Sequence, residues 1–180
     1  MIENRKELKE FLNYEKNIYI DDWKDYYKKK FSNNEKYFLW KFQKHLRKAE
    51  YYKNCTKSIF YKLIFCYHIN RKNKYGNMLG IYISINTVDK GLTIFHSGEI
   101  IVSGISKCGK NLRLHGNNCI GNKGVDGVAP IIGDNCDIGF GAVVIGDISL
   151  GNDIKIGANA VVTKNFNEGT LVGIPARRIK

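Results

Sequence analysis

The chain has 180 residues, 43% of them hydrophobic, and a formal net charge of +12 at pH 7. This length suits one domain with a small attachment, and the hydrophobic content argues against global disorder. No run of about 20 apolar residues is present, which argues against a membrane-spanning helix, and the charged start MIENRKELKE lacks the apolar segment of a signal peptide. We expect a cytoplasmic protein, with the inner face of the membrane as a further location.

The positive charge is concentrated in the first half. Residues 1–80 hold 19 basic and 9 acidic residues, whereas residues 81–180 hold 10 and 8. This asymmetry indicates an anionic partner, such as nucleic acid, a lipid surface or a phosphorylated substrate, with a solvated helical surface as the alternative. We retain peripheral membrane contact through the basic N-terminal helices as an expectation and expect no nucleic-acid partner. Five cysteines form no CxxC pair, and no His, Cys and Asp spacing indicates a metal site, so we expect reduced thiols and no metal.

Three helices are predicted in the first half. Residues 4–19 carry apolar side chains at helical spacing, and residues 33–55 do so over a longer stretch, with Asn34 as a candidate N-cap. Residues 58–73 form a third, strongly apolar helical pattern. We expect a helical N-terminal region at residues 1–79, whose helices pack on each other or cover the neighbouring domain.

From residue 80 the chain is rich in glycine and its period becomes six. After residue 129 it divides without a gap into the hexads PIIGDN, CDIGFG, AVVIGD, ISLGND, IKIGAN and AVVTKN. The third position is always aliphatic, the first is small or apolar, and the fourth is Gly in four of the six hexads. A parallel β-helix has this period, with one short strand and one tight turn per hexad, and we expect Gly to supply the unusual turn angles. The predicted fold is mainly β, with a β-helix over residues 80–180.

The six-residue step is interrupted twice upstream. Two residues are inserted at FHSG, between Leu92 and Ile100, and the polar, Gly-rich stretch 121–129 breaks the register again. We interpret the second interruption as a protruding loop. Function tends to lie at such interruptions, because the repeat itself is occupied with packing.

The hexads, the loop and the ending VVTKNFNEGTLVGIPARRI resemble the hexapeptide-repeat acyltransferases, whose fold is a left-handed β-helix. Within that family the chain is similar to the serine acetyltransferases and to O-acetyltransferases of bacterial polysaccharide gene clusters. The segment WKFQKHLRKAEYYKNC looks like the helical lead-in of the second group. The resemblance implies a homotrimer with a C-terminal tail, acetyl-CoA in grooves between adjacent subunits, and a His acting as general base.

The resemblance places the general base at His96, in FHSGEIIV. A His side chain suits this role because its pKa lies near the working pH, and it can deprotonate a hydroxyl that attacks a thioester. His96 also lies at the break in register, which favours function over a surface His in a turn. His115, in LRLHGNN, is the competing candidate, as base or as a substrate contact, whereas His45 and His68 are expected to pack in helices.

Three positions depart from the serine acetyltransferases. That family carries Asp immediately before the base, Arg-His before the Pro that follows the loop, and an Asp that orients the base. Here these positions are Phe95, Val128–Ala129 and Ile81. Asp89, Glu99 or a backbone carbonyl is expected to orient His96 instead.

These departures lead us to predict a sugar acceptor. They remove the partners of a zwitterionic serine, and an aromatic side chain beside the base suits stacking on a sugar face. We expect direct acetylation of a sugar hydroxyl of a surface polysaccharide or its precursor. Serine O-acetylation in cysteine biosynthesis and a non-catalytic β-helical binding module are the alternatives. Candidate acceptor contacts are Phe95, Asn117 and Asp126.

Coenzyme A requires a groove with exposed backbone amides and cations for its phosphates. Small residues on successive turns and a C-terminal basic cluster suit these needs, although solvation alone is an alternative for the cluster. The candidate coenzyme-binding residues are Gly139, Phe140, Gly141, Ala142, Gly157, Ala158, Thr163, Lys164, Arg177, Arg178 and Lys180. Of these, the resemblance supports Thr163, Lys164 and Arg177 most directly, and Phe140 stands where many relatives have a small residue.

Overall fold

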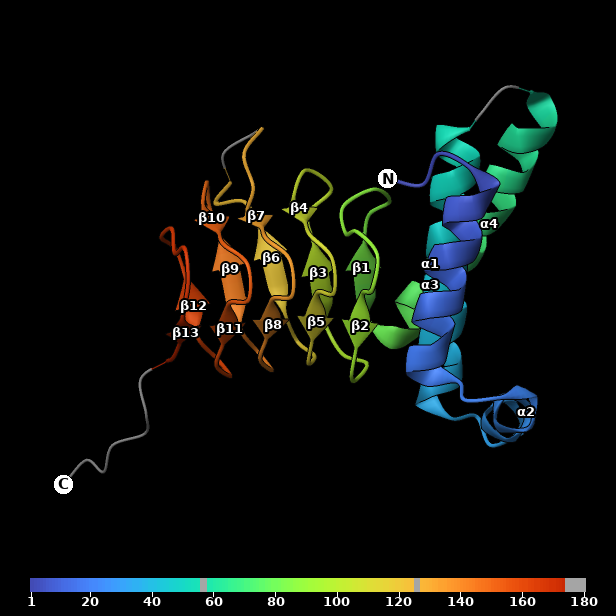
Figure 1. Ribbon diagram of the computed structural model, residues 1–180, viewed down its shortest axis with the longest axis horizontal. Coiled ribbons are helices and arrows are strands. Elements are labelled where there is room, and N and C mark those ends of the chain that lie inside the picture. Colours follow the sequence, from blue (N-terminus) through green and yellow to red (C-terminus); the bar gives the residue numbers. More distant parts are fainter. Residues whose placement is uncertain (56–57, 125–126, 174–180) are drawn as a thin grey trace.

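The computed structural model describes residues 1–55, 58–124 and 127–173, in which four helices precede a long series of short strands (Figure 1). The helices are α1 (Arg5–Tyr19), α2 (Trp23–Phe31), α3 (Glu35–Asn54) and α4 (Ile59–Leu79). The strands are β1 (Ile81–Ile83), β2 (Thr93–Ile94), β3 (Ile100–Val102), β4 (Lys107–Cys108), β5 (Arg113–Leu114), β6 (Cys119–Gly121), β7 (Ile131–Ile132), β8 (Asp137–Ile138), β9 (Val143–Ile145), β10 (Ser149–Leu150), β11 (Lys155–Ile156), β12 (Val161–Val162) and β13 (Thr170–Leu171).

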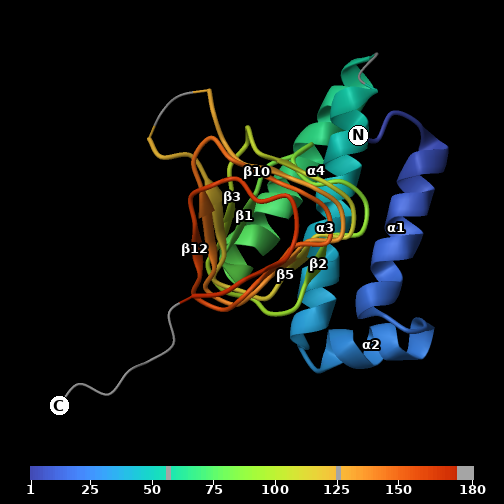
Figure 2. The same ribbon diagram turned by 60° about the vertical axis from the view of Figure 1, so that its left-hand side comes forward.

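The strands form three parallel sheets that run along the length of a left-handed β-helix. Sheet I has the order β1-β3-β6-β9-β12, sheet II has β10-β7-β4, and sheet III has β13-β11-β8-β5-β2. The chain visits the sheets in turn, so three successive strands and their turns make one coil, and the coils stack side by side (Figure 2). The predicted fold class, a left-handed parallel β-helix preceded by helices, is confirmed.

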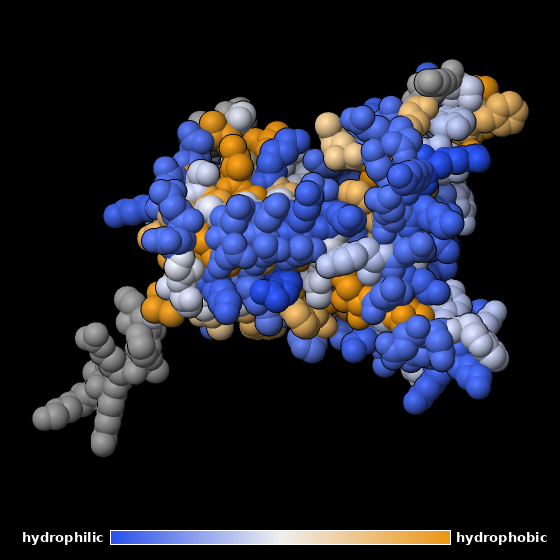
Figure 3. Space-filling view, viewed as in Figure 1, coloured by the Kyte–Doolittle hydropathy of each residue, from blue (hydrophilic) through white to orange (hydrophobic). Residues whose placement is uncertain are grey.

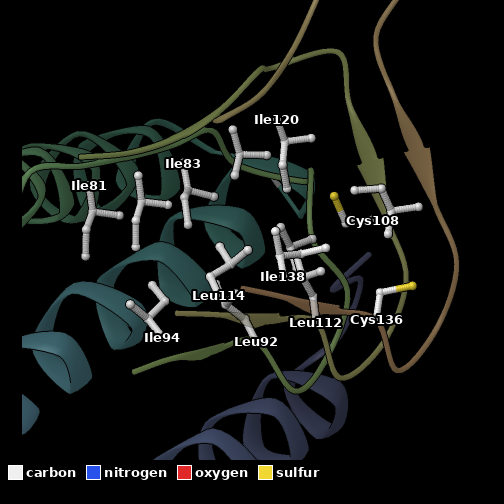
Figure 4. Close-up of a cluster of buried hydrophobic side chains, with 14 of the residues drawn as sticks. Ile81, Ile83, Leu92, Ile94, Cys108, Leu112, Leu114, Ile120, Cys136 and Ile138 are labelled. Atoms are coloured by element: carbon white, nitrogen blue, oxygen red, sulfur yellow. The ribbon is translucent and has the colours of Figure 1, made fainter. Parts of the chain in front are cut away.

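Aliphatic side chains stack inside the β-helix, one from each coil. In sheet I the paired positions Ile83, Val102, Ile120, Val144 and Val162 are all at most 4% exposed. Sheets II and III contribute similar ladders, and Figure 4 shows these side chains converging on the axis. Each buried aliphatic side chain of this size stabilises the fold by about 1.5–3 kcal/mol, so the ladders account for the aliphatic third position of every hexad.

Glycine and asparagine together supply the left-handed backbone angles of the turns. Gly91, Gly116, Gly141 and Gly146 have positive φ, as predicted for glycine, but asparagine does the same at other turns. Asn111, Asn135 and Asn159 have φ of +56°, +59° and +56°, whereas the fourth-position Gly133 and Gly139 are not among the residues with positive φ. These glycines are required for a different reason. A Cβ on Gly139 would lie 2.6 Å from the Ile156 carbonyl oxygen of the next coil, so a side chain there would push the coils apart.

The helices cover one end of the β-helix, at the edge of its first coil (Figure 1). Arg47 of α3 is fully buried and joins three elements. Its guanidinium donates to the Glu15 carboxylate of α1 at 2.7 Å, to Glu50 at 3.0 Å, and to the Val88 and Asp89 carbonyls of the first coil, both at 2.7 Å. Burial opposes the positive charge, but the two carboxylates raise the pKa of Arg47 above its ordinary value.

The helical region differs from the sequence prediction in two places. The short helix α2 was not predicted, because WKDYYKKKF has no apolar stripe and none of its residues is buried. The third predicted helix continues to Leu79, where Gly80 ends it in the left-handed conformation with φ of +71°. The predicted N-cap is confirmed, since the Asn34 side chain accepts a hydrogen bond from the Lys36 amide. Among the described residues, no helix is long and apolar enough to cross a membrane.

Candidate active site

His96 lies on the turn that leads from sheet III to sheet I, between β2 and β3. Eight residues separate the core positions Ile94 and Val102, whereas six separate Leu114 from Ile120 in the next coil. The longer turn carries the imidazole away from the coil, and the His96 side chain is 68% exposed. Among the described residues, His96 Nδ1 faces a carboxylate, and His96 Nε2 makes no hydrogen bond or ion pair. The arrangement leaves Nε2 free to accept a proton from a bound molecule.

The carboxylate beside His96 belongs to Glu35, the first residue of α3. Glu35 Oε1 accepts a hydrogen bond from the Ser97 amide at 2.5 Å, and Oε2 lies 3.7 Å from His96 Nδ1. The helical region therefore reaches the turn that holds the candidate base. Asp89 and Glu99, which we expected to orient His96, make other contacts: Asp89 Oδ1 accepts from the Lys90 amide, and Glu99 is exposed with its own amide bonded to Asn117.

His115 lies one coil further along, and its ring is occupied on two sides. Its Nε2 is 2.7 Å from Asp137 Oδ1, and Asp137 Oδ2 is 3.2 Å from Arg113 Nε. Phe95 stacks on the imidazole, with 4.4 Å between the ring centroids. Phe95 thus covers one face of His115, while 41% of Phe95 itself remains exposed. His115 and Asp137 form a compact pair that is fixed within the wall of the β-helix.

The turns from sheet III to sheet I form one continuous edge, which we call the III–I edge. It carries His96, then Gly116, then Phe140 with Gly141, then Gly157 with Ala158. A Cβ on Gly116 would lie 3.0 Å from the Phe140 ring and 3.7 Å from His96 Cβ, so the aromatic ring lies close to the turn of the candidate base. Phe140 is 47% exposed. Ala142, the last residue of the turn that carries Phe140 and Gly141, is fully buried in the core.

A second edge, the I–II edge, is made by the turns from sheet I to sheet II. A cavity of about 450 Å³ over the last coil is lined by Thr163 and Lys164 of this edge, by Phe166, by Ala160–Val162 and by Thr170–Val172 on the sheet III side. A neighbouring cavity of about 410 Å³ is lined by Lys123 and Val128 of the loop, by Gly146–Ile148 and again by Thr163. Two of the predicted coenzyme-binding residues, Thr163 and Lys164, therefore lie at this edge.

The candidate site residues fall on opposite sides of sheet I. His96, His115, Phe95, Phe140 and Ala158 belong to the III–I edge, while Thr163, Lys164 and the loop belong to the I–II edge. Asn117 is exposed at the III–I edge, and its side-chain oxygen accepts from the Glu99 amide. The predicted residues Asp126, Arg177, Arg178 and Lys180 lie outside the described residues.

Sequence reasoning missed Glu35 and Asp137 as partners of the two histidines. Glu35 lies more than 60 residues before His96 and follows an ordinary N-cap, so no local pattern connects them. Asp137 could have been found. It occupies the second position of the hexad CDIGFG, which pairs with Arg113 in the coil before, next to His115. The hexad register places Asp137 outward beside Arg113, close to His115, and this pattern predicts a carboxylate partner for His115.

Comparison with known proteins gives a consistent result. No protein-family model matches the chain. The serine acetyltransferase of Mycobacterium tuberculosis is 34% identical over 89 residues, which cover 48% of this chain and 39% of that protein. The serine acetyltransferase of Helicobacter pylori is 34% identical over 95 residues, covering 51% and 56%. The chain thus matches between about a third and just over half of the length of these curated relatives.

Solved structures share the fold. Serine acetyltransferase from Brucella abortus superposes with a TM-score of 0.66 at 18% identity, over 97% of this chain and 70% of that one. The soybean serine acetyltransferase apoenzyme gives 0.65 at 18% identity, over 96% and 69%. A serine acetyltransferase in complex with CoA gives 0.58 at 20% identity, over 79% and 55%. This chain has the fold of the serine acetyltransferases. Both its helical region and its β-helix take part in the match.

These comparisons overturn the predicted acceptor. The matched curated proteins, at 32–35% identity, are named serine acetyltransferases. The prediction of a polysaccharide sugar, which was based on Phe95 and on missing charged partners, is therefore wrong.

Proposed function

We propose that this protein is an O-acetyltransferase that transfers the acetyl group of acetyl-CoA to the hydroxyl of L-serine. One observation carries the proposal: His96 stands exposed at the single lengthened turn of the III–I edge, with Nδ1 facing a carboxylate and Nε2 open. The names of the sequence relatives select serine among the hydroxyl acceptors.

The chemistry follows from that geometry. A serine hydroxyl is a poor nucleophile at neutral pH, and His96 Nε2 removes its proton as the oxygen attacks the thioester carbonyl. The new C–O bond forms, the C–S bond breaks, and the protonated imidazole returns the proton to the departing thiolate. The products are O-acetylserine and coenzyme A. Backbone amides of the turns are suited to stabilise the oxyanion of the tetrahedral intermediate.

The I–II edge fits a coenzyme. The cavity at this edge lies beside Lys123 and the cavity over the last coil lies beside Lys164, and both cations suit the phosphates of the coenzyme. Thr163 contributes to both cavities and adds a hydroxyl. Thr163 and Lys164 are the described residues that we assign to coenzyme binding.

A homotrimer completes this site. The outward side chains of sheet I are Tyr82, Ile101, Cys119, Val143 and Val161, and they pair in register from coil to coil. Tyr82, Ile101 and Val161 are 52%, 39% and 64% exposed, so sheet I presents a continuous apolar strip to solvent. Such a strip favours burial against another subunit. Cyclic packing across sheet I would bring the III–I edge of one subunit to the I–II edge of the next.

The decisive experiment measures thiol release from acetyl-CoA with L-serine as acceptor. Wild type is expected to release thiol only when L-serine is present, with little turnover of D-serine or L-alanine. His96→Ala is expected to lower kcat by about 10²–10⁴-fold, the usual contribution of a general base. Full activity of His96→Ala with loss in His115→Ala would transfer the role to His115. No coenzyme A binding by calorimetry would favour the non-catalytic binding module.

A second property, contact with an anionic membrane surface, is proposed from α4. Its first half exposes apolar side chains along one face: Ile59, Phe60, Leu63 and Tyr67 are 57–72% exposed. The start of α4 forms the outer tip of the helical region (Figure 1), and hydrophobic surface is exposed at that tip (Figure 3). This half of the chain also carries most of the positive charge. Phe60→Asp/Leu63→Asp should abolish flotation with vesicles of anionic lipid, while Met78→Asp, exposed near the other end of α4, should not. Flotation of neither wild type nor variants removes this proposal.

A further inference from the structure

The helical region contributes a carboxylate to the candidate active site. Glu35 follows the N-cap Asn34, whose side chain accepts from the Lys36 amide and so fixes where α3 begins. From that position Glu35 bridges two atoms of the turn: Oε1 accepts from the Ser97 amide, and Oε2 lies 3.7 Å from His96 Nδ1. Catalytic hydrogen bonds are often long before substrate binds and shorten in the complex.

We propose that Glu35 is a positioning residue that holds the His96 imidazole with its hydrogen on Nδ1. In that tautomer Nε2 carries the lone pair and faces solvent, where the acceptor hydroxyl arrives. This inference depends on the proposed function in one respect, namely that His96 is the general base. The inference gives α3 the task of orienting the imidazole of His96. Among the described residues of the β-helix, none contacts His96 Nδ1 in this way.

The charge of Glu35 supports this role. Partial burial disfavours its ionised form, but the hydrogen bonds from Ser97 and the nearby His96 outweigh burial and hold the pKa of Glu35 below its usual value. A carboxylate accepts hydrogen bonds and cannot donate one. Because Oε1 is already engaged by Ser97, the only interaction that Oε2 can offer His96 is acceptance of the Nδ1 hydrogen.

Glu35→Gln tests the tautomer directly. The amide oxygen of Gln keeps the acceptor for the Ser97 amide, so its nitrogen is turned toward His96. That nitrogen donates, and His96 Nδ1 must then accept, which moves the ring hydrogen to Nε2 and removes the basic lone pair from the acceptor side. A merely structural role predicts the reverse: isosteric Gln would be nearly harmless, and Glu35→Ala would be the damaging variant.

Kinetics separate the two cases. We expect Glu35→Gln to lower kcat at least about tenfold, with the KM for acetyl-CoA unchanged, and to be no milder than Glu35→Ala. Glu35→Asp, which keeps the charge, should recover part of the loss. Glu99→Gln, on the same turn but away from His96 Nδ1, is the matched control and should behave as wild type. Near-wild-type kcat in Glu35→Gln would overturn the proposal.

Nitrogen-15 NMR of the four histidines gives a readout that needs no activity. In wild type the His96 signals should report a protonated Nδ1 and a bare Nε2 at a pH where the ring is neutral; in Glu35→Gln the two should exchange roles. An unchanged His96 pattern in Glu35→Gln contradicts the inference even if the enzyme is active. The expected exchange in a protein without acetyltransferase activity would uphold Glu35 and refute the proposed function.

Discussion

Sheets I and III have the same interior and opposite exteriors. Inside, both carry buried aliphatic ladders, for example Val102 and Ile120 in sheet I and Leu114 and Ile138 in sheet III. Outside, sheet I carries Tyr82, Ile101, Cys119, Val143 and Val161, while sheet III carries Thr93, Arg113, Asp137, Lys155 and Thr170. The interior is dictated by the coil, which must fill its own core. The exterior is free to vary, so its chemistry indicates what each sheet faces.

Breaking the apolar exterior should have the largest effect. Ile101→Asp places a charge at the middle of the sheet I strip, and we expect the assembly to dissociate. Because the two edges of the site lie on opposite sides of sheet I, activity with L-serine should fall at least about 100-fold, since one subunit holds only half of the site. Light scattering after size exclusion measures the mass, and thiol release measures the rate.

Lys155→Glu, at an outward position of sheet III, is the control for Ile101→Asp. It changes charge on the same β-helix and should leave both mass and rate as in wild type. A monomeric Ile101→Asp that keeps full activity would show that one subunit holds a complete site, and sheet I would lose its assigned role.

At the first coil, the surface that packs against the β-helix is the helical region of the same chain, so the effect of breaking a contact can be measured within one subunit. Arg47→Met leaves the buried carboxylates of Glu15 and Glu50 without their counter-ion. Removing one member of a buried ion network costs about 3–5 kcal/mol, and we expect the free energy of unfolding to fall by this amount in urea titrations. Lys36→Met, exposed on the same helix, should change it by less than about 0.5 kcal/mol. Equal stability of the two variants would mean that the network does not hold the helices on the first coil.

Substituting a fourth-position glycine tests how closely neighbouring coils must stack along the axis of the β-helix. Gly139→Ala would bring a Cβ to 2.6 Å from the Ile156 carbonyl oxygen, and we expect a loss of about 1–3 kcal/mol as the coils separate. Gly121→Ala is the matched control, since the nearest atom to its Cβ is Cys119 Sγ at 3.9 Å. Similar thermal midpoints for the two variants would contradict the view that fourth-position glycines are needed for close stacking.

The sequence allowed the β-helix to be predicted and left much of the site undetermined, for one physical reason. The hexad repeats because each coil packs against an equivalent coil on either side, so the six-residue period alone predicts that Ile132 and Ile138 lie in the core. Helix α2 has no such neighbours: its N-cap Asp22 and the contacts of Lys29 with Tyr19 and Asp25 hold it, and these produce no apolar period. The contact between Glu35 and His96 depends on how the helical region docks on the first coil, which no local pattern encodes.

The smallest expected effect is on the pH dependence of stability. It concerns the interior of the helical region, where buried side chains form individual contacts instead of the repeated ladders of the β-helix. His45 of α3 and His68 of α4 are buried with their Nδ1 atoms 2.8 Å apart. Burial lowers the pKa of His45 to about 3 and that of His68 to about 4, and nearby positive charges, among them Lys44, add to the effect. Both rings are therefore neutral in the folded protein at physiological pH.

The sign of the pH dependence follows. In the unfolded chain each His has a pKa near 6.5, so below that pH the unfolded state binds more protons than the folded state. Stability is complete above about pH 6.5 and declines as the pH falls toward about 4, by on the order of 1 kcal/mol per pH unit. Urea titrations at pH 7.5 and 5.5 measure this slope. His45→Gln/His68→Gln should flatten it, because no buried ring remains to be protonated, whereas His96→Gln, whose ring is exposed, should keep it. A slope that survives in the double variant would assign the acid sensitivity to other groups and leave the histidine pair as ordinary packing between α3 and α4.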